Sequence, residues 1–386
     1  MTLEHYVEVG KKRLRCGYTT GTCAAAAAQA CGQALLAGGF PHSLRIDTPA
    51  GVAVVVEPEE MHRGTDAQGT PWASCGVRKD AGDDTDATDD ALVVVRVSLT
   101  DTPGTTIEGG AGVGRVTRAG LDQPVGAAAI NSVPRAMIAS ELERVAREHG
   151  WQGGFAVEVS VSGGEEIARK TFNPRLGIVG GLSILGTSGI VDPMSEQALV
   201  NTIHTEMDSR RAAGQAHLLA FFGNYGVDFS RDHLGLDVSP RVTISNYVGE
   251  TLDYAAYKGF SDVLLIGHIG KLVKVAQGIM NTHSRYADGR TTLLALEAVF
   301  AGASREVAQK IYDSLTTDEA VRLLKETGLL EPVMAAVCEK IEAYMDQRTH
   351  GQVPTAAVVF SNAYGVLGQS SRAKAFLALH TKGELR

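Results

Sequence analysis

The chain has 386 residues, of which 44% are hydrophobic and 21% are charged, and its formal net charge is −8. A chain of this length exceeds a single ordinary hydrophobic core, so we expect two domains. The acidic balance and the lack of a Lys/Arg-rich run argue against a nucleic-acid partner. No apolar stretch reaches about 18 residues and no signal-peptide core is present, which predicts a cytoplasmic protein without a membrane partner.

The cysteines predict thiols rather than disulfides. None of the five forms a CxxC pair or a Cys/His spacing typical of zinc, and an odd number fits a reducing compartment. We therefore expect buried free thiols at Cys16, Cys23, Cys31, Cys75 and Cys338.

The first half of the chain predicts an α+β domain. A threonine-rich segment leads into a run of alanines, which predicts a helix over residues 19–37. Hydroxyl and N–H groups at this helix start are suited to hold an anion, whereas plain N-capping would explain one threonine. The candidate anion ligands are Thr19, Thr20 and Thr22.

A second helix and four strands are predicted in the rest of this half. The helix is amphipathic and covers residues 134–149. The strands are short apolar or alternating runs at 44–47, 52–57, 92–99 and 155–161. The boundary is expected near residues 171–173, which gives domains at 1–172 and 173–386.

An acidic loop covers residues 77–90 and holds six carboxylates in the eleven residues from Asp80. It is not a calcium-binding EF-hand loop, because the glutamate required at the twelfth position is absent. Three interpretations stay open: a solvated turn, carboxylates that accept hydrogen bonds from a ligand, or carboxylates that hold a basic neighbour in place. The candidate residues of this loop are Asp80, Asp83 and Asp84, which sit beside Gly82.

A glycine-rich segment at 109–114 precedes Arg115 and Arg118. It does not match the GxGxxG of dinucleotide-binding proteins or the Lys-Ser/Thr of a P-loop. The two arginines beside a flexible backbone are suited to bind carboxylates, and ordinary surface arginines are the alternative.

From residue 173 onward, strand-like and helix-like segments alternate, which predicts a doubly wound, mostly parallel, Rossmann-like sheet. Strand-like runs at 218–222, 242–244, 263–266 and 356–360 each end in a turn rich in glycine or asparagine. Separate tight turns would explain each one, but four alike at strand ends favour a shared pocket edge. Helices are expected at 195–213, 251–258 and 271–280, with a mostly helical stretch over 291–330.

A dense polar cluster follows the third of these strands. Its side chains are too numerous for helix packing alone, which indicates a functional segment. They are Asn281, His283, Ser284, Arg285, Asp288 and Arg290.

Together these segments resemble the cobalt-precorrin-5B C1-methyltransferase family of the oxygen-independent cobalamin pathway. The resemblance covers nearly the whole chain, with small departures at loop tips: Thr85 and Ala87 stand where Pro and Val are expected, and Ala111 where Glu is common. The segments that carry it are GYTTGTCAAAAA, KDAGDD, GVGRVTRAGLDQPVGAAAINSVPR, NPRLGIVGGLSILGTSGIVDPMSEQAL, SNYVGETLD, LLIGHIGKLVK and IMNTHSRYADGR.

The resemblance implies S-adenosylmethionine as methyl donor and a cobalt-containing tetrapyrrole as acceptor. The cobalt needs no protein ligand, because the macrocycle supplies its own, so no protein-bound metal is expected. The donor is expected in the second domain, at the carboxyl edge of the sheet. Its candidate ligands are Gly223, Asn224, Tyr225, Gly226, Asn246, Gly267, Gly270 and Asn362.

The tetrapyrrole is expected to contact the first domain. Its acetate and propionate groups require local cations and helix N-termini on an otherwise acidic protein. Besides the threonines and the carboxylates of the acidic loop, the candidate substrate ligands are Lys79, Arg115, Arg118, Arg175, Lys271 and Arg285. A catalytic base is needed only if a proton leaves the macrocycle; the candidates are His283 and His268, with Asp288 as an orienting group.

Two other functions remain open at this point. A nicotinamide-dependent oxidoreductase would use the same kind of sheet, although the GxGxxG pattern is missing. A non-catalytic carrier of corrinoid intermediates would bind the tetrapyrrole without a donor site. The apolar positions over residues 291–344 fit a core, and a homodimer interface is the alternative.

Overall fold

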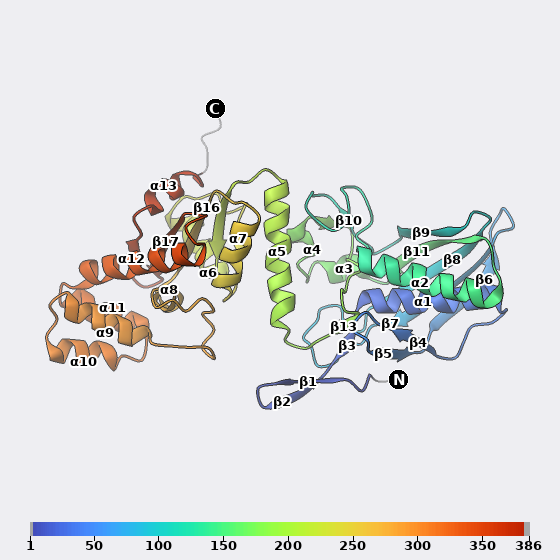
Figure 1. Ribbon diagram of the computed structural model, residues 1–386, viewed down its shortest axis with the longest axis horizontal. Coiled ribbons are helices and arrows are strands. Elements are labelled where there is room, and N and C mark those ends of the chain that lie inside the picture. The colour runs from blue at the N-terminus through green and yellow to red at the C-terminus, as the bar shows by residue number, and fades with distance from the viewer. Residues whose placement is uncertain (1–2, 382–386) are drawn as a thin grey trace. The chain divides into compact units, whose positions relative to one another are not determined.

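The computed structural model describes residues 3–381 and forms two compact units that divide between Glu196 and Gln197 (Figure 1). The division falls later than the boundary expected at residues 171–173. The reason is strand pairing, because residues 173–191 return to the first unit. Strand β12 (Ile178–Val179) pairs with β10 (Arg115–Val116), and β13 (Ile190–Val191) pairs with β3 (Gly17–Tyr18).

The first unit is built on a five-stranded mixed sheet. Its order across the sheet is β6 (Glu59–Thr65), β7 (Pro71–Arg78), β8 (Leu92–Thr100), β11 (Gly154–Val161) and β9 (Gly104–Gly109). All neighbours are antiparallel except β9 and β11, which run parallel. The strands expected at 92–99 and 155–161 are confirmed as central neighbours, whereas β6, β7 and β9 were not predicted.

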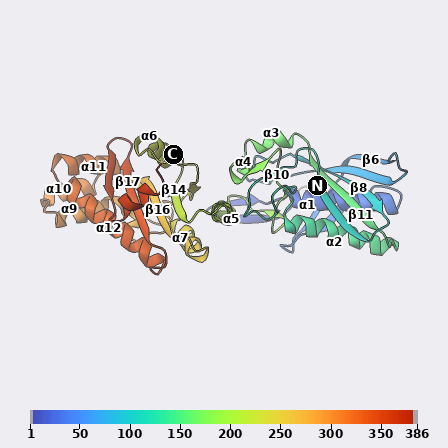
Figure 2. The same ribbon diagram turned by 90° about the horizontal axis from the view of Figure 1, so that it is seen from above.

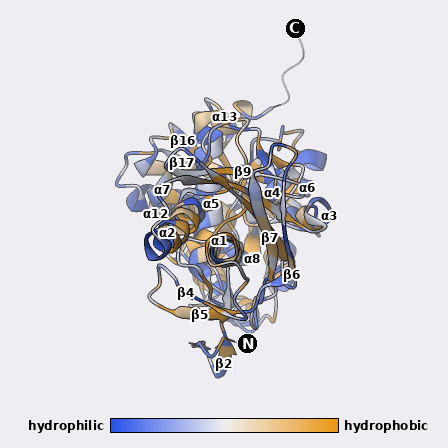
Figure 3. Ribbon diagram, turned by 90° about the vertical axis from the view of Figure 1, so that its right-hand side faces the viewer, coloured by the Kyte–Doolittle hydropathy of each residue, from blue (hydrophilic) through white to orange (hydrophobic). Residues whose placement is uncertain are grey.

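Helix α1 (Thr20–Leu36) lies against β7, β8 and a second helix, α2 (Ser132–His149). Residues 24–28 of α1 are all alanines and all fully buried, because small side chains let the helix approach the sheet closely. In α2 the buried residues recur at helical spacing, and Figure 3 shows both hydrophobic and hydrophilic residues on it. Both predicted helices are confirmed.

Smaller elements complete the first unit. Two hairpins are formed by β1 (Tyr6–Val9) with β2 (Lys12–Arg15) and by β4 (Leu44–Asp47) with β5 (Ala53–Val56). Two short helices are α3 (Gly164–Ala168) and α4 (Asn173–Leu176). The five cysteines of the chain are free and buried, as predicted.

The second unit contains a five-stranded sheet whose first four strands are parallel and whose last is antiparallel. Its order is β15 (Val242–Thr243), β14 (His217–Phe221), β16 (Asp262–His268), β17 (Thr355–Ser361) and β18 (Gly365–Gln369). The chain passes from β14 to β15 on one side and returns to β16 on the other. The boundary between β14 and β16 is therefore the switch point at which parallel sheets bind ligands.

Alternate residues of this sheet face two different cores. Leu218, Val263 and Leu265 pack on one face, while Leu219 and Leu264 pack on the other, which explains the unbroken apolar runs. Figure 2 shows α6 (Asn224–His233) and α12 (Leu330–Arg348) on opposite sides of β16 and β17.

The remaining helices of the unit divide between the two faces. The larger core includes residues from α5 (Glu196–Ala212), α7 (Val248–Tyr257), α8 (Ile269–Val275), α9 (Arg290–Phe300), α10 (Arg305–Tyr312) and α11 (Thr317–Glu326). The smaller core includes α13 (Ala373–Ala378). Within residues 3–381, no helix is both long and apolar enough to cross a membrane.

Candidate functional site

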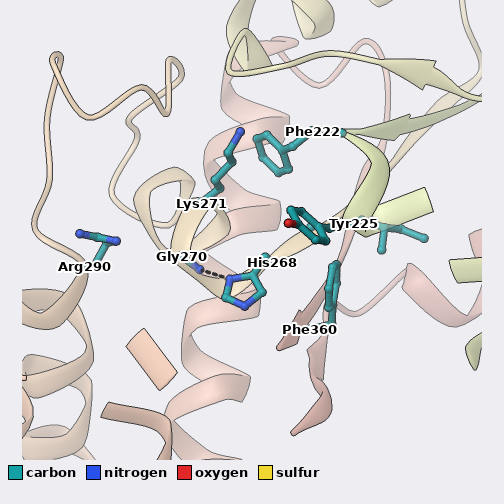
Figure 4. A pocket seen from close by; sticks show the side chains of 11 residues that line it. Phe222, Tyr225, His268, Gly270, Lys271, Arg290 and Phe360 are labelled. Atoms are coloured by element: carbon teal, nitrogen blue, oxygen red, sulfur yellow. Dashed lines mark hydrogen bonds between the residues drawn. The ribbon is translucent and has the colours of Figure 1, made fainter. Parts of the chain in front are cut away.

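A cavity of about 340 Å³ lies at the carboxyl ends of the parallel strands in the second unit (Figure 4). Its volume is within the range typical of small-molecule sites. It is located at the switch point, because its walls include Phe222 and Gly223, which follow β14, and His268, which ends β16. The lining residues are Phe222, Gly223, Tyr225, Gly226, Ile266, Gly267, His268, Gly270, Lys271, Arg290 and Phe360.

The glycines allow the backbone and an aromatic ring to form the cavity walls. A Cβ atom at Gly267 would lie 2.5 Å from the ring of Phe222, so only glycine admits the ring at its present position. At Gly226 a Cβ would meet the Phe221 ring at 3.1 Å and the Ile266 carbonyl oxygen at 3.3 Å. Gly223 instead leaves open space at the start of α6.

His268 links the end of β16 to the start of α8. Its Nδ1 accepts a hydrogen bond of 3.2 Å from the Gly270 N–H and so caps the helix. Burial lowers the pKa of His268 below its ordinary value of 6.5, although Asp318 opposes the shift. The neutral imidazole therefore carries its proton on Nε2, which makes it a hydrogen-bond donor at that atom.

Lys271 provides a cation beside an aromatic wall. Its Nζ lies 5.0 Å from the centre of the Phe222 ring and 3.4 Å from the Ser245 carbonyl oxygen. Burial and, to a smaller degree, Lys274 lower the pKa of Lys271. Within residues 3–381 no carboxylate forms an ion pair with this ammonium group, so it is suited to bind an anionic ligand.

Arg290 lies on the side of the cavity opposite the aromatic rings (Figure 4). Its guanidinium donates to both oxygens of Asp288, at 2.8 and 2.9 Å. Hydrogen bonding to Arg290 lowers the pKa of Asp288 to about 2. Asp288, predicted to orient a histidine, thus orients Arg290 in this structure.

The structure separates the two histidines predicted as bases. His268 lines the cavity, whereas His283 is exposed on the segment between α8 and α9. The His283 Nδ1 accepts a hydrogen bond of 3.2 Å from the Arg285 N–H. Their assignment as bases stays a prediction.

Five of the residues predicted as donor ligands line the cavity: Gly223, Tyr225, Gly226, Gly267 and Gly270. The other three do not line it. Asn224 is the first residue of α6. The Asn246 Oδ1 accepts a hydrogen bond of 3.0 Å from the Thr282 hydroxyl, and Asn362 is exposed in the turn after β17.

Several residues of the cavity wall were not predicted from the sequence. Phe222, Ile266 and Phe360 had no expected site role, and Arg290 was noted only as a member of the polar cluster. The three apolar residues lie at or next to the ends of strands, just before the polar turns. That position was the available signal.

The predicted threonine ligands of the first unit are buried and hydrogen-bonded within the protein. Thr19 is the N-cap of α1, so the capping alternative is confirmed for that residue. Thr22 donates to the Gly189 carbonyl oxygen at 2.7 Å, and Thr20 to the Leu185 carbonyl oxygen at 3.3 Å. These hydroxyl groups therefore hold residues 185–189 against the start of α1.

The acidic loop holds basic neighbours in place, as one of its three interpretations predicted. Asp80 pairs with Arg15, and Asp83 accepts a hydrogen bond of 2.6 Å from the Arg15 backbone N–H. Lys79 is buried and its Nζ lies 2.6 Å from Asp86 Oδ2. Asp84 accepts a hydrogen bond from the Met194 N–H. Most charged side chains of the acidic loop thus form ion pairs or hydrogen bonds within the first unit.

The predicted substrate arginines also make internal contacts. Arg115 is exposed and donates to the Gly126 carbonyl oxygen at 3.1 Å. Arg118 donates to the Arg175 carbonyl oxygen at 3.0 Å, and the Arg175 guanidinium lies 5.4 Å from the centre of the Phe172 ring. Arg285, in the second unit, donates to the hydroxyl of Tyr286.

Fold and site define a mixed α/β protein with a ligand cavity at the carboxyl ends of parallel strands. The chain belongs to the CbiD family. The CbiD family model matches residues 7–193, and the model of the CbiD C-terminal domain matches residues 281–371.

Two similar proteins are both named cobalt-precorrin-5B C(1)-methyltransferase. The one from Ruminiclostridium cellulolyticum is 46% identical over 93% of this chain and 92% of its own. The one from Alkaliphilus metalliredigens is 41% identical over 98% of each chain. A crystal structure of a cobalamin biosynthesis protein (cbiD) from Archaeoglobus fulgidus is 28% identical, covers 73% of this chain and 86% of that chain, and has a TM-score of 0.38.

Proposed function

We propose that this protein transfers a methyl group from S-adenosylmethionine to C1 of cobalt-precorrin-5B, giving cobalt-precorrin-6A in the anaerobic cobalamin pathway. The observation that carries the proposal is the identity of 46% to a relative of that name over nearly the whole of both chains. The relatives' names do not favour an oxidoreductase or a carrier. We also propose that the second unit is a Rossmann-like domain that binds the donor.

The cavity is the proposed donor site, and its residues fit the donor chemically. Aromatic rings at Phe222, Tyr225 and Phe360 offer stacking surfaces for adenine, and the backbone at Gly223 is open to a ligand. Lys271 would attract the donor's carboxylate and repel its sulfonium. We therefore propose that the amino-acid end of the donor lies toward Lys271.

The reaction forms a carbon–carbon bond to the macrocycle and breaks the sulfur–methyl bond, whose electron pair stays on sulfur. Alignment of the two reactants supplies much of the rate, because effective molarities contribute roughly 7–11 kcal/mol. His268 is proposed to donate a hydrogen bond from Nε2, since its Nδ1 is engaged with Gly270. A base is required only if a proton leaves the macrocycle, and His283 remains the candidate.

The macrocycle is proposed to bind the first unit through its carboxylates. Arg115 is a suitable cation of that unit, because its side chain is 54% exposed and the carboxylate it pairs with, on Glu108, lies at 3.8 Å. Lys79, by contrast, is buried against Asp86. Its proposed role is therefore to position the loop.

Calorimetric titration with S-adenosylmethionine, its demethylated product and NADH tests the donor assignment. We expect micromolar binding of the first two compounds and no binding of NADH. A methyl-transfer assay with the cobalt-loaded tetrapyrrole should then give one product heavier by a methyl group. Binding of NADH alone would overturn the proposal, and tetrapyrrole binding without methyl transfer would indicate a carrier.

Arg115→Ala tests the placement of the macrocycle. We expect weaker tetrapyrrole binding by roughly tenfold, the scale of one charge-assisted pair, and unchanged donor binding. Arg45→Ala is the control, because Arg45 is also exposed and, among the residues that the structure describes, forms an ion pair only with Asp47. Equal loss of both ligands would contradict the placement.

A homodimer stays a prediction, which sedimentation of the purified protein tests.

A further inference from the structure

A buried lysine holds the segment that connects α8 to α9. Lys274 lies on α8 with a relative exposure of 3%. Its Nζ donates to the Thr282 carbonyl oxygen at 3.2 Å and to the Ala287 carbonyl oxygen at 2.9 Å. One ammonium group therefore joins two points of the chain that are five residues apart.

The residues between these points form an exposed loop. Residues 283–286 are all exposed, while Thr282 is buried and its hydroxyl bonds to Asn246. Within residues 3–381, Lys274 makes no ion pair, so backbone carbonyls stabilise its buried charge. A buried ammonium group is costly without such partners, which indicates that both carbonyls are held firmly.

The loop leads directly into the cavity wall. Ala287 precedes Asp288, whose carboxylate holds the guanidinium of Arg290, and Arg290 lines the cavity. Release of Ala287 would free the segment that sets the position of Arg290. Lys271 precedes Lys274 by three residues on α8 and lines the cavity. Helix α8 therefore supplies one cation of the cavity and fixes the loop that presents the other.

We propose that Lys274 is a positioning residue that clamps residues 282–287 and thereby presents Arg290 to the ligand in the cavity. The clamp itself is independent of which ligand binds. Its effect on the methyl donor rests on the function proposed above.

Limited proteolysis tests the clamp without any ligand. Trypsin cleaves after Arg285, which is exposed in the middle of the loop. Lys274→Met keeps most of the length of the side chain but removes its hydrogen-bond donors. In this variant the rate of cleavage after Arg285 should rise by roughly tenfold or more, because a hydrogen bond from a charged donor contributes on that scale. Lys274→Arg should restore slow cleavage, because a guanidinium can donate to both carbonyls.

Lys310→Met is the matched control, since it removes an exposed lysine of α10 and the same charge. Cleavage after Arg285 at the wild-type rate in Lys274→Met would overturn the clamp. If Lys274→Met fails to fold, Lys274→Gln carries the same test, because its amide is polar but too short to reach both carbonyls. Thermal unfolding of each variant separates loop release from loss of the fold.

Calorimetric titration of the same variants with S-adenosylmethionine tests whether the clamp affects ligand binding in the cavity. Affinity should fall by roughly tenfold in Lys274→Met and return in Lys274→Arg. Faster cleavage with unchanged affinity would overturn the link to the cavity but keep the clamp. If the wild-type protein does not bind the donor, the proposed function fails, and the proteolysis arm alone decides the clamp.

Discussion

The Asp80 carboxylate accepts two hydrogen bonds from the Arg15 guanidinium, at 2.6 and 2.8 Å, across 65 positions of sequence. Both side chains are about one-quarter exposed, at 27% and 22%. A third hydrogen bond, from the Gly82 N–H, reaches the same carboxylate. The pair thus connects the acidic loop to β2 and determines the shape of the loop.

Asp80→Asn should destabilise the first unit by about 1–3 kcal/mol, because Arg15 loses a charged partner while partly buried. Asp47→Asn is the control, since the pair of Asp47 with Arg45 is exposed and its loss should stay within about 0.5 kcal/mol. Urea unfolding measures both. Equal effects would show that the Arg15 pair is as weak as a surface pair.

The ion pair of Arg15 and Asp80 should also make the free energy of unfolding of the first unit depend on pH. Hydrogen bonding to Arg15 lowers the pKa of Asp80 below its ordinary value of 3.8. The stabilisation is therefore fully present above about pH 4, and it is lost as the pH falls through the lowered pKa. The difference in unfolding free energy between wild type and Asp80→Asn should stay constant from pH 7 to about 4 and should shrink below about pH 4, as urea unfolding at each pH would measure.

Gly267→Ala should weaken binding of the methyl donor while the protein remains folded. The new Cβ would lie 2.5 Å from the Phe222 ring and would push that ring out of the cavity wall. Loss of one aromatic contact predicts a fall in affinity of about tenfold. Gly39→Ala is the control, because a Cβ there meets nothing within 4 Å. Unchanged affinity, measured by calorimetry, would remove this turn from the donor site.

Lys271→Met should weaken binding of the demethylated product by roughly tenfold at neutral pH, because its carboxylate loses a cation. Burial lowers the pKa of Lys271 below 10.5, so the wild-type advantage should shrink as the pH rises through that lowered value. Titrations of wild type and variant from pH 7 to 10 measure the difference. A constant difference would exclude a charge-based role.

His268→Asn separates the capping role of this residue from its chemical role. Asparagine can cap α8, so stability should change little, whereas His268→Ala should cost about 0.5–2 kcal/mol. Both variants lose the Nε2–H and should lower the rate of methyl transfer in single-turnover assays. A normal rate in His268→Asn would limit this residue to capping.

Much of the fold follows from local patterns. The alanine run predicted α1, and unbroken apolar runs predicted β14, β16 and β17, because a strand that is covered on both faces has apolar residues at every position. Strand β7 was missed, since Pro71 and Gly76 are poor strand residues. It is a strand because it pairs with β6 and β8. Helix α8 ends earlier than predicted, at Val275.

The family, the alternating strands and helices of the second half, and the turns that end the parallel strands can all be recognised in the amino-acid sequence alone. These features depend on residues close together in the chain. Which polar groups are available to a ligand depends instead on contacts between distant parts of the chain. Asp80 and Lys274 are engaged by partners from other elements, whereas Lys271 faces the cavity. Ion pairs, hydrogen bonds and burial depend on distances in space, and spacing along a single sequence does not record those distances.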